Sequence, residues 1–366
     1  MTIALIAGAR PNFIKIAPII KEFEQNQVEY TLIHTGQHYD YDMSKVFFEQ
    51  LSLPEPDYYL GIGSGSHNYQ IAHTMLSLEK VFTKIQPYIV VVVGDVNSTL
   101  AGALSAVKAG FPVAHIEAGL RSFDKTMPEE INRILTDSIS DFLFTTCLDA
   151  NENLLREGIT SEKIHFVGNV MIDTLLMLKE YIDSSKILEQ FGLIDQPFIY
   201  ITLHRPSNVD VPSQVDKIAN ALTELSGMGI KIIFPIHPRT KANLKNFGLL
   251  EKYDKIPNLI ITQPLGYVDA IALMQASKAV ITDSGGVQEE TTFLGIPCLT
   301  LRPNTERPIT IKIGTNTLLH NGPDMIPEEV DKILKGNFRK GSVPELWDGK
   351  AAKRIVRVLK SALNYN

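Results

Sequence analysis

Residues 89–95 read IVVVVGD, an apolar run that ends in a glycine and a carboxylate. A helical pattern follows at Leu100–Ala109, and a second apolar run comes next at Val113–Ile116. Short apolar runs that alternate with helical patterns are typical of a parallel sheet covered by helices on both faces. The stretch therefore predicts an α/β protein built on a doubly wound parallel sheet.

The same alternation continues along the chain. Further strands are expected at Ile3–Ala7, Tyr30–Ile33, Phe142–Thr145 and Ile164–Val167 in the first half, and at Phe198–Thr202, Lys231–Ile236, Leu259–Thr262, Ala279–Thr282 and Cys298–Leu301 in the second. Further helices are expected at Glu129–Ser140, Ser213–Leu225, Val268–Gln275 and Val287–Leu294. The two halves are alike in plan, which predicts two doubly wound sheets that face each other.

A domain boundary is expected where the alternation loosens. The segment Asp183–Asp195 is polar, and a new strand begins at Phe198. We therefore place the change of domain between Gly168 and Gln196. The expected domains are residues 1–170, residues 171–350, and a C-terminal helix over residues 351–366 that can pack back on the N-terminal domain.

The composition fits two globular domains. The 366 residues exceed the roughly 100–200 of a typical domain, and 44% of them are hydrophobic, enough to fill two cores. With 21% charged residues, 24 glycines and 20 prolines, the chain differs from disordered, collagen-like and coiled-coil proteins. The two cysteines, Cys147 and Cys298, lie in apolar runs, so we expect buried thiols rather than disulfides or a metal knuckle.

The net charge and the apolar runs also argue against several partners. The net charge of -6 disfavours nucleic-acid binding, although a local basic cluster can still hold a small anion. The longest apolar run, Tyr88–Val93, is far shorter than the roughly 18 residues of a membrane helix. The N-terminus shows neither a basic flank nor a cleavage site, so we expect a cytoplasmic location without membrane insertion.

Three carboxylates follow the expected strands of the first half. Open parallel sheets bind ligands at the carboxyl ends of their strands. Asp95 and Glu117 each end an apolar strand, where a desolvated carboxylate can exchange protons near neutrality. Glu129 follows Pro128 at an expected helix start, where a carboxylate is also favourable for the helix alone. Together the three predict acid–base chemistry next to an anionic leaving group.

The triplet Ser284-Gly285-Gly286 is the best candidate for a phosphate site. It lies between an expected strand and a helix, where two glycines admit a phosphate oxygen to the backbone and the helix N-terminus attracts it. One turn later, Glu290 can accept ribose hydroxyls, although a carboxylate near a helix start needs no ligand to explain it. Arg307 carries a guanidinium that matches phosphate oxygens, with a surface salt bridge as the alternative.

Further cationic groups follow other strands. Arg10 and Lys15, after the first strand, can approach an anion together with backbone N–H groups, or form an ordinary charge pair at a helix start. His204 and His237 both end strands of the second half beside Arg and Pro. Two histidines near a phosphate site can donate hydrogen bonds to phosphate or transfer protons.

His34 and His38 have the spacing of zinc ligands. Gly36 between them favours a loop over a single helical face, and no cysteine or third ligand is near in the sequence. We therefore expect no metal site there.

Taken together, these segments resemble the non-hydrolysing UDP-N-acetylglucosamine 2-epimerases, whose fold is similar to that of two-Rossmann-domain glycosyltransferases. The likeness runs over essentially the whole chain and depends on the order and spacing of its segments. The segments that carry it are Gly8–Lys15, Gly94-Asp95, residues 115–121 (HIEAGLR), 127–133 (MPEEINR), 203–205 (LHR) and 237–240 (HPRT), Thr282–Glu290, and residues 305–308 (TERP). The resemblance implies two Rossmann-like domains facing a central cleft, the GT-B-like arrangement, and a homodimer that needs no cofactor or metal.

The resemblance also implies a reaction, the interconversion of UDP-GlcNAc and UDP-ManNAc by inversion at C2 of the sugar. UDP would be eliminated to leave 2-acetamidoglucal and then added back, with the C2 proton delivered to the opposite face. Breaking the anomeric C–O bond makes the weakly acidic C2 proton removable, so the diphosphate must be anchored strongly.

The residues that match functional positions of this family divide into two sets. By resemblance, the catalytic set is Asp95, Glu117, Glu129 and His204. By resemblance, the UDP-binding set is Arg10, Lys15, His237, Tyr267, Ser284, Gly285, Gly286, Glu290 and Arg307. We expect Asp95 and Glu117 to handle the C2 proton on opposite faces. Glu129 would support these two carboxylates, and His204 would interact with the departing phosphate.

Other functions stay open at this point. The opening Gly8–Phe13 is similar to that of relatives acting on UDP-diacetamido-uronic acids, so a related UDP-2-acetamido sugar is one alternative substrate. A GT-B glycosyltransferase, which would need an acceptor site, is another, and so is a hydrolysing epimerase, which would release free ManNAc and UDP. A non-catalytic nucleotide-sugar sensor is disfavoured, because a sensor does not need three clustered carboxylates.

Overall fold

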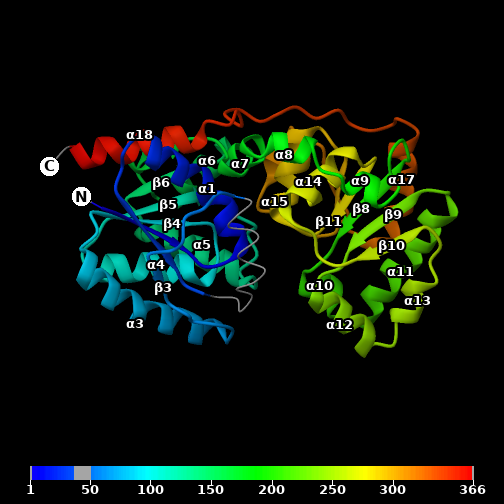
Figure 1. The fold of residues 1–366 in the computed structure, drawn as a ribbon, viewed down its shortest axis with the longest axis horizontal. Helices are drawn as coiled ribbons and strands as arrows, with labels where there is room; N and C mark the ends of the chain where they lie inside the picture. Colours follow the sequence, from blue (N-terminus) through cyan, green and yellow to red (C-terminus); the bar gives the residue numbers. More distant parts are fainter. Residues whose placement is uncertain (1, 37–50, 365–366) are drawn as a thin grey trace. The chain divides into compact units, whose positions relative to one another are not determined.

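The structure is a computed structural model that describes residues 2–36 and 51–364 (Figure 1). Two parallel sheets flanked by helices make up the described chain, which confirms the predicted α/β fold. The chain divides into two compact units, Met1–Met177 with Glu345–Asn366, and Leu178–Pro344.

The first unit holds a seven-stranded sheet in the order β3-β2-β1-β4-β5-β6-β7, with every neighbouring pair parallel. Its strands are β1 (Ile3–Ala7), β2 (Tyr30–His34), β3 (Tyr58–Tyr59), β4 (Ile89–Val93), β5 (Val113–Ala118), β6 (Phe142–Thr145) and β7 (Ile164–Phe166). The chain builds outward from β1 to β3 and then places β4 on the other side of β1. The carboxyl ends of β1 and β4 therefore form the switch point of this sheet, where open α/β sheets bind ligands.

Helices cover the first sheet, and the C-terminal helix is one of them (Figure 1). They are α1 (Arg10–Gln25), α3 (His67–Ile85), α4 (Asn97–Lys108), α5 (Pro128–Ile139), α6 (Leu148–Arg156), the short 3₁₀ helix η1 (Ser161–Lys163), α7 (Val170–Met177) and α18 (Ala351–Asn364). Helix α18 packs against α1 and α7. The Asp173 carboxylate of α7 caps it by accepting hydrogen bonds from the backbone N of Ala351 (3.2 Å) and Ala352 (2.7 Å).

The second unit repeats the plan with a six-stranded parallel sheet in the order β10-β9-β8-β11-β12-β13. Its strands are β8 (Phe198–Thr202), β9 (Lys231–Pro235), β10 (Leu259–Thr262), β11 (Ala279–Thr282), β12 (Cys298–Thr300) and β13 (Asn316–Leu318). The chain reverses direction across the sheet between β10 and β11, so the switch point lies at the carboxyl ends of β8 and β11.

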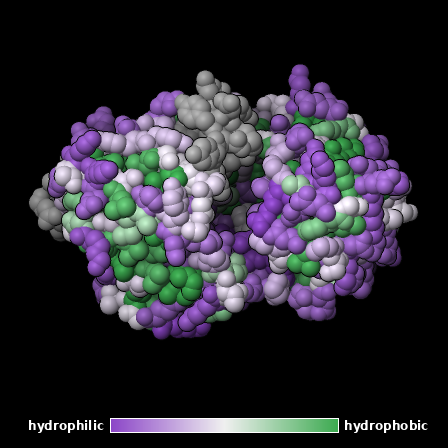
Figure 2. All heavy atoms as spheres, turned by 90° about the horizontal axis from the view of Figure 1, so that it is seen from below, coloured by the Kyte–Doolittle hydropathy of each residue, from purple (hydrophilic) through white to green (hydrophobic). Residues whose placement is uncertain are grey.

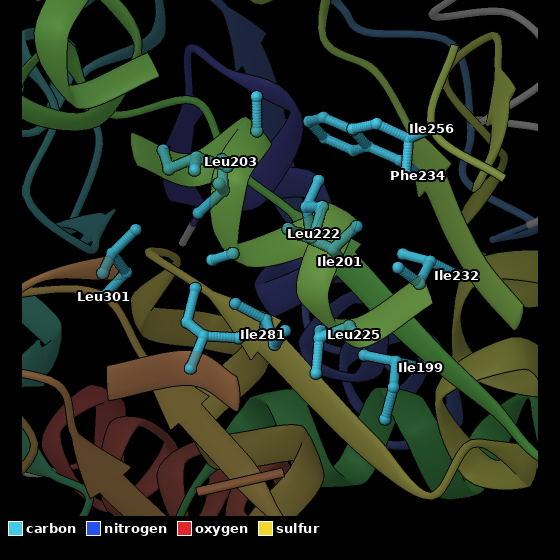
Figure 3. Packing of buried hydrophobic residues seen from close by; sticks show 14 of the residues in the cluster. Ile199, Ile201, Leu203, Leu222, Leu225, Ile232, Phe234, Ile256, Ile281 and Leu301 are labelled. Atoms are coloured by element: carbon cyan, nitrogen blue, oxygen red, sulfur yellow. The ribbon is translucent and has the colours of Figure 1, made fainter. Parts of the chain in front are cut away.

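Apolar side chains of strands and helices form the core of the second unit. Figure 3 shows Ile199 and Ile201 of β8 packed with Leu222 and Leu225 of the following helical layer. The helices are α8 (Lys179–Asp183), α9 (Ile187–Gln190), α10 (Pro206–Val209), α11 (Pro212–Gly227), α12 (Pro238–Asn246), α13 (Leu250–Asp254), α14 (Tyr267–Ala276), α15 (Gly285–Leu294), α16 (Pro308–Lys312), η2 (Pro323–Met325) and α17 (Ile326–Leu334). Burying each such side chain contributes roughly 1.5–3 kcal/mol, and this holds the strand ends in place.

Every strand expected from the sequence forms, within two residues of its expected bounds. The edge strands β3 and β13 were not expected, because neither Tyr58–Tyr59 nor Asn316–Leu318 contains an apolar run. Both cysteines are buried free thiols, as predicted, and burial raises the pKa of Cys298 to about 11. Within residues 2–36 and 51–364, each helix is too short or too polar to span a bilayer.

Candidate functional site

The turn after β1 is held against β4 by Asn12. Its Oδ1 accepts hydrogen bonds from the backbone N of Gly8 and of the next residue, at 3.1 and 3.0 Å, and its Nδ2 donates to the carbonyl of Val93 at 3.0 Å. A side chain at position 8 would collide with Ser98, because a Cβ there would lie 2.1 Å from its Oγ. Arg10 begins α1 at this turn, but its side chain lies outside the described residues.

Glu117 lies on a β-bulge at the end of β5. Its backbone φ is +73°, which is strained for any residue but glycine, and the pairing of β5 with β6 shifts register there. The buried Glu117 carboxylate forms an ion pair with Lys15 Nζ from α1. Gly94 lies beside this pair, since a Cβ there would be 3.1 Å from Lys15 Nζ. Strain of this kind costs about 1–3 kcal/mol and concentrates at functional sites, which supports a functional role for Glu117.

Asp95, at the end of β4, is held by Arg133 of α5. Arg133 Nη1 lies 2.5 Å from Asp95 Oδ2, and Nη2 lies 2.5 Å from Glu130 Oε2. Glu130 also accepts hydrogen bonds from the backbone N of Ser122 (3.0 Å) and Phe123 (2.8 Å). Burial acts to raise the pKa of Glu130, but Ser122 and Arg133 hold it below its ordinary value. Glu130 is therefore a structural anion, whereas the Asp95 side chain stays 24% exposed.

A buried charge network lies behind these strand ends. His115 Nδ1 is 2.6 Å from Asp137 Oδ1, and its Nε2 is 2.7 Å from the carbonyl oxygen of Gly94. Because both partners are acceptors, an imidazolium that donates from both nitrogens satisfies this geometry. Asp137 also accepts from the backbone N of Gly119 (3.0 Å) and pairs with Arg121 (2.7 Å). Burial acts to raise the pKa of Asp137, but His115 and Arg121 hold it below its ordinary value, and the network ties the ends of β4 and β5 together.

The remaining first-unit candidates are Glu129 and His34. Glu129 lies half-buried in the first turn of α5, the helix that also carries Arg133. His34 is buried at the end of β2, where its Nδ1 accepts a hydrogen bond from the backbone N of Gly36 at 2.7 Å. Burial lowers the pKa of His34 to about 4, so the ring is neutral. His38, its partner in the zinc-like spacing, lies outside the described residues.

In the second unit, Ser284, Gly285 and Gly286 form the N-terminus of α15. The Ser284 side chain does not cap this ten-residue helix, so its first-turn N–H groups can bind an anion. A Cβ at Gly285 would lie 2.3 Å from Arg307 Nη1. The guanidinium of Arg307 therefore lies against the helix start, and the structure brings these four predicted residues together.

Two buried carboxylates hold Arg307 in this position. Its Nε lies 3.0 Å from Glu289 Oε1, and its Nη1 pairs with Glu306. Glu306 also pairs with Arg302 at 2.7 Å. Because all four side chains are buried, the surface salt bridge considered as an alternative for Arg307 is wrong.

Glu290 is buried one turn into α15, near two phenols. Burial raises the pKa of Glu290 to about 8, a rise that Tyr267 partly offsets and Glu289 reinforces. The Tyr267 hydroxyl lies near Glu290 but outside hydrogen-bond geometry, and its buried oxygen has no hydrogen-bond partner among the described residues. Burial, together with Glu290, also raises the pKa of Tyr200. An unsatisfied buried hydroxyl costs about 1–3 kcal/mol, so this cluster suits a ligand with hydroxyl or amide groups.

His204 and His237 lie together at the carboxyl edge of the second sheet, with ring centroids 6.2 Å apart. His204 follows β8, and its Nδ1 is 2.9 Å from Asp283 Oδ1. His237 is the N-cap of α12, where its Nδ1 accepts from the backbone N of Arg239 at 3.2 Å.

The predicted site residues thus divide between the two units. The first unit holds Lys15, Asp95, Glu117 and Glu129, and the second holds His204, His237, Tyr267, Ser284, Gly285, Gly286, Glu290 and Arg307. Sequence reasoning did not assign Arg133 and Asp283, which contact Asp95 and His204, or the buried pair His115 and Asp137 behind the strand ends. Two of these residues could have been found from the sequence. Arg133 lies three residues after Glu130, the spacing of an ion pair on one helix face, and Asp283 directly follows an apolar strand.

Comparison with known proteins identifies the family. A family profile described as UDP-N-acetylglucosamine 2-epimerase matches residues 21–360. The chain belongs to the UDP-N-acetylglucosamine 2-epimerase family. This confirms the resemblance predicted from the sequence segments and makes the protein a member of an isomerase family.

Curated members of the epimerase family align over nearly the full chain. A UDP-N-acetylglucosamine 2-epimerase of Methanocaldococcus jannaschii is 44% identical over 363 residues, which are 98% of this chain and 99% of the relative. A UDP-2,3-diacetamido-2,3-dideoxy-D-glucuronate 2-epimerase of Pseudomonas aeruginosa is 43% identical, again over 98% of this chain and 99% of the relative. Overall identity therefore does not separate these two substrates.

Solved structures agree with the fold of the epimerase family. The Methanocaldococcus jannaschii UDP-GlcNAc 2-epimerase in complex with UDP-GlcNAc and UDP superposes with a TM-score of 0.92 at 42% identity, covering 99% of this chain and 100% of that one. A glycosyltransferase from Rickettsia africae superposes with a TM-score of 0.56 at 14% identity, covering 100% of this chain and 99% of that one. This second likeness concerns the fold alone and agrees with the predicted GT-B-like class.

Proposed function

We propose that this protein is a non-hydrolysing epimerase that interconverts UDP-GlcNAc and UDP-ManNAc. The observation that carries the proposal is the pair of strand-end carboxylates in the first unit. Asp95 is held by Arg133, and Glu117 is held by Lys15 on a strained bulge. A protein that only binds nucleotide sugars has no need of two strand-end carboxylates held by cations, whereas a proton-transfer enzyme needs carboxylates fixed in position.

The proposed reaction has two steps. In the first, a carboxylate removes the C2 proton while the C1–O bond breaks, the electron pair leaves with the β-phosphate oxygen of UDP, and 2-acetamidoglucal remains. In the second, that oxygen adds back to C1 and a proton is delivered to the opposite face of C2. The overall change is an inversion without net oxidation, so no redox cofactor enters the balance.

The carboxylates divide this work between two faces of the sugar. We assign the C2 proton to Asp95 on one face and to Glu117 on the other, with Glu129 in support. Lys15 was predicted as a UDP contact. Because it pairs with Glu117, we assign it first to stabilising the ionised carboxylate.

The second unit would anchor UDP. The N–H groups at the start of α15 and the guanidinium of Arg307 provide positive charge for the diphosphate. His204 and His237 would donate to phosphate oxygens, with His204 nearest the bond that breaks. Glu290 and Tyr267 would meet the ribose and uracil. A cytoplasmic location is part of the same proposal.

Product analysis by proton NMR tests this function. UDP-GlcNAc and UDP-ManNAc should each give the same equilibrium mixture of the two sugars, still attached to UDP. Asp95→Asn and Glu117→Gln should each lower kcat by about 10²-fold or more, as expected for a lost proton-transfer group. Asp141→Asn, which changes an exposed carboxylate paired with Lys163, is the matched control and should leave kcat unchanged.

Three results would favour a rival function. Free ManNAc with one equivalent of UDP would indicate a hydrolysing epimerase. UDP release that depends on an added sugar acceptor would indicate a glycosyltransferase. Turnover of a UDP-diacetamido-uronic acid, with UDP-GlcNAc left untouched, would indicate the substrate of the Pseudomonas aeruginosa relative.

We also propose that the protein is a homodimer that pairs through the helical layer α3, α4 and α5. Large apolar side chains are exposed along this layer, among them Leu76, Val107 and Leu135. Figure 2 shows hydrophobic side chains gathering on the first unit. Between α3 and α4 lies a groove of about 410 Å³, in which apolar residues such as Phe82 and Phe111 alternate with polar ones such as Glu79 and Lys108. Soluble monomers rarely expose large apolar patches, so a second copy is the expected occupant.

Sedimentation velocity tests the homodimer. The wild-type chain should sediment as a dimer, and Leu76→Asp should shift it toward monomer because a charge would be buried in the interface. Leu334→Asp changes an exposed leucine of α17 in the second unit and should leave the dimer intact. A wild-type monomer at micromolar concentration would contradict the proposal.

A further inference from the structure

Asp283 lies at the switch point of the second sheet and contacts the loop after β8. Strands β8 and β11 are neighbours, with Thr202 paired to Thr282, so the residues that follow them lie side by side. Asp283 is fully buried. Its carboxylate lies 2.9 Å from His204 Nδ1 and accepts a hydrogen bond from the backbone N of His204 at 3.1 Å. It also accepts hydrogen bonds from the backbone N of Arg205 at 2.9 Å and from Asn208 Nδ2 at 3.0 Å.

Every backbone and amide partner of Asp283 is a donor, so the group is an ionised carboxylate. Burial acts to raise the pKa of Asp283, but the contacts with His204, Asn208 and Arg205 hold it below its ordinary value. An ionised carboxylate only accepts hydrogen bonds, so the ring nitrogen that faces it must carry a proton. The proton therefore lies on Nδ1 of His204, and Nε2 is the nitrogen left for a ligand. Besides Asp283, the groups described near this ring are His237, with centroids 6.2 Å apart, and the adjacent Arg205.

We propose that Asp283 is a positioning residue of the epimerase reaction, which holds His204 as a doubly protonated ring whose Nε2–H meets the departing phosphate oxygen. This inference depends on the role proposed above for His204. With Nδ1 protonated, a neutral ring would present only a lone pair at Nε2, which would repel phosphate. Donation to phosphate therefore requires the charged ring, and the carboxylate at Nδ1 stabilises that charge.

The substitution Asp283→Asn separates positioning from general support of the fold. Its amide keeps the shape of the carboxylate but has one oxygen and one NH₂ group. The oxygen is expected where two donors converge, Arg205 N and Asn208 Nδ2, which leaves the NH₂ group facing His204. The ring must then accept at Nδ1 and carry its single proton on Nε2. A neutral Nε2–H still binds phosphate but stabilises the developing charge less.

Nitrogen NMR of the histidine rings, with and without UDP, tests the proposal. Signals of His204 are assigned by their loss in His204→Gln. In the wild-type UDP complex both ring nitrogens should be protonated, and in Asp283→Asn only Nε2 should be. We expect kcat to fall about tenfold or more while the Kd of UDP changes less than about threefold, as for a weakened proton donor. Asp210→Asn, the same change beside Arg239, should alter neither the ring signals nor kcat.

Two further measurements can overturn the inference. In the His204→Gln background, Asp283→Asn should lower kcat no further, because Asp283 acts through the ring. An additional loss there, or unchanged ring signals in Asp283→Asn, would reduce Asp283 to a structural residue. If Asp283→Asn does not fold, the nitrogen NMR spectrum of the wild type provides the test. An unprotonated Nδ1 of His204 in the UDP complex would contradict the proposal. A wild-type chain without epimerase activity but with the predicted ring signals would instead overturn the proposed function.

Discussion

Gly285→Ala should damage both the stability of the second unit and its affinity for UDP. A methyl group at this position would lie 2.3 Å from Nη1 of Arg307 and 2.6 Å from Oε1 of Glu306. The guanidinium has little room to move away, because it is buried and paired with Glu289 and Glu306. Overpacking of this kind costs about 1–3 kcal/mol, and a loss near 2 kcal/mol lowers Tm by about 4–8 °C in a unit of this size.

The effect of Gly285→Ala on UDP follows from the same displacement. The methyl group lies at the start of α15, where phosphate would approach the backbone, and it moves the cation beside it. We expect the Kd of UDP to rise at least tenfold, which corresponds to about 1.4 kcal/mol. Isothermal titration calorimetry measures the Kd, and differential scanning calorimetry measures Tm.

Gly227→Ala is the matched control for this experiment. Gly227 is the last residue of α11, and a Cβ there would meet no atom within 4 Å. Alanine should stabilise this helix by up to about 1 kcal/mol and leave the Kd of UDP unchanged. The reasoning is refuted if Gly285→Ala melts within 1 °C of the wild type, about the resolution of the scan, and also binds UDP with wild-type affinity.

Three other predictions concern buried charges. Lys15→Met removes the cation from buried Glu117 and should lower the free energy of unfolding by about 3–5 kcal/mol in chemical denaturation, whereas Lys217→Met, which breaks an exposed pair, should change it by less than about 0.5 kcal/mol. Equal losses of unfolding free energy in Lys15→Met and Lys217→Met would contradict this prediction. Burial raises the pKa of Asp173 to about 6 from 3.8, so its folded form binds a proton more tightly than the unfolded chain. The free energy of unfolding of the wild type, relative to that of Asp173→Asn, should therefore increase by up to about 3 kcal/mol as the pH falls from about 6.5 to 4. A difference between the two proteins that does not change with pH would contradict this prediction. Burial raises the pKa of Glu290 to about 8, while ribose hydroxyls favour its ionised form. The affinity for UDP should rise between about pH 7 and 9 in the wild type and not in Glu290→Gln, and parallel curves would exclude this role.

The fold could be predicted from the sequence because strands that are apolar throughout must be buried on both faces, and helices on both sides of the sheet provide that burial. Residues 89–93 are all buried in β4, as their composition requires. The strand that carries Glu117 was harder to predict. It was expected to end at Ile116, but β5 continues to Ala118 through a bulge in which a glutamate has positive φ. Local propensity disfavours that conformation, so only the surrounding packing can impose it.

The buried ion pairs were the least predictable part of the site. Sequence position placed Arg307 near a phosphate turn, yet its pairing with Glu289 depends on the loop before α16 meeting α15. The same holds for Asp137 of α5, whose partners His115 and Arg121 come from β5 and from the loop that follows it. A sequence shows which charges exist, but their desolvation and pairing follow from tertiary packing.

The C2 proton offers the most direct test of the proposed reaction. The protein is incubated with UDP-GlcNAc in heavy water, and the sugar is examined by NMR and mass spectrometry. We expect deuterium at C2 in UDP-GlcNAc and in UDP-ManNAc, both still joined to UDP. When Glu117→Gln replaces the wild type, labelled product of the opposite C2 configuration should form about 10²-fold more slowly. A lack of exchange with every UDP-2-acetamido sugar, or label found only in free sugar beside an equivalent of released UDP, would contradict the account.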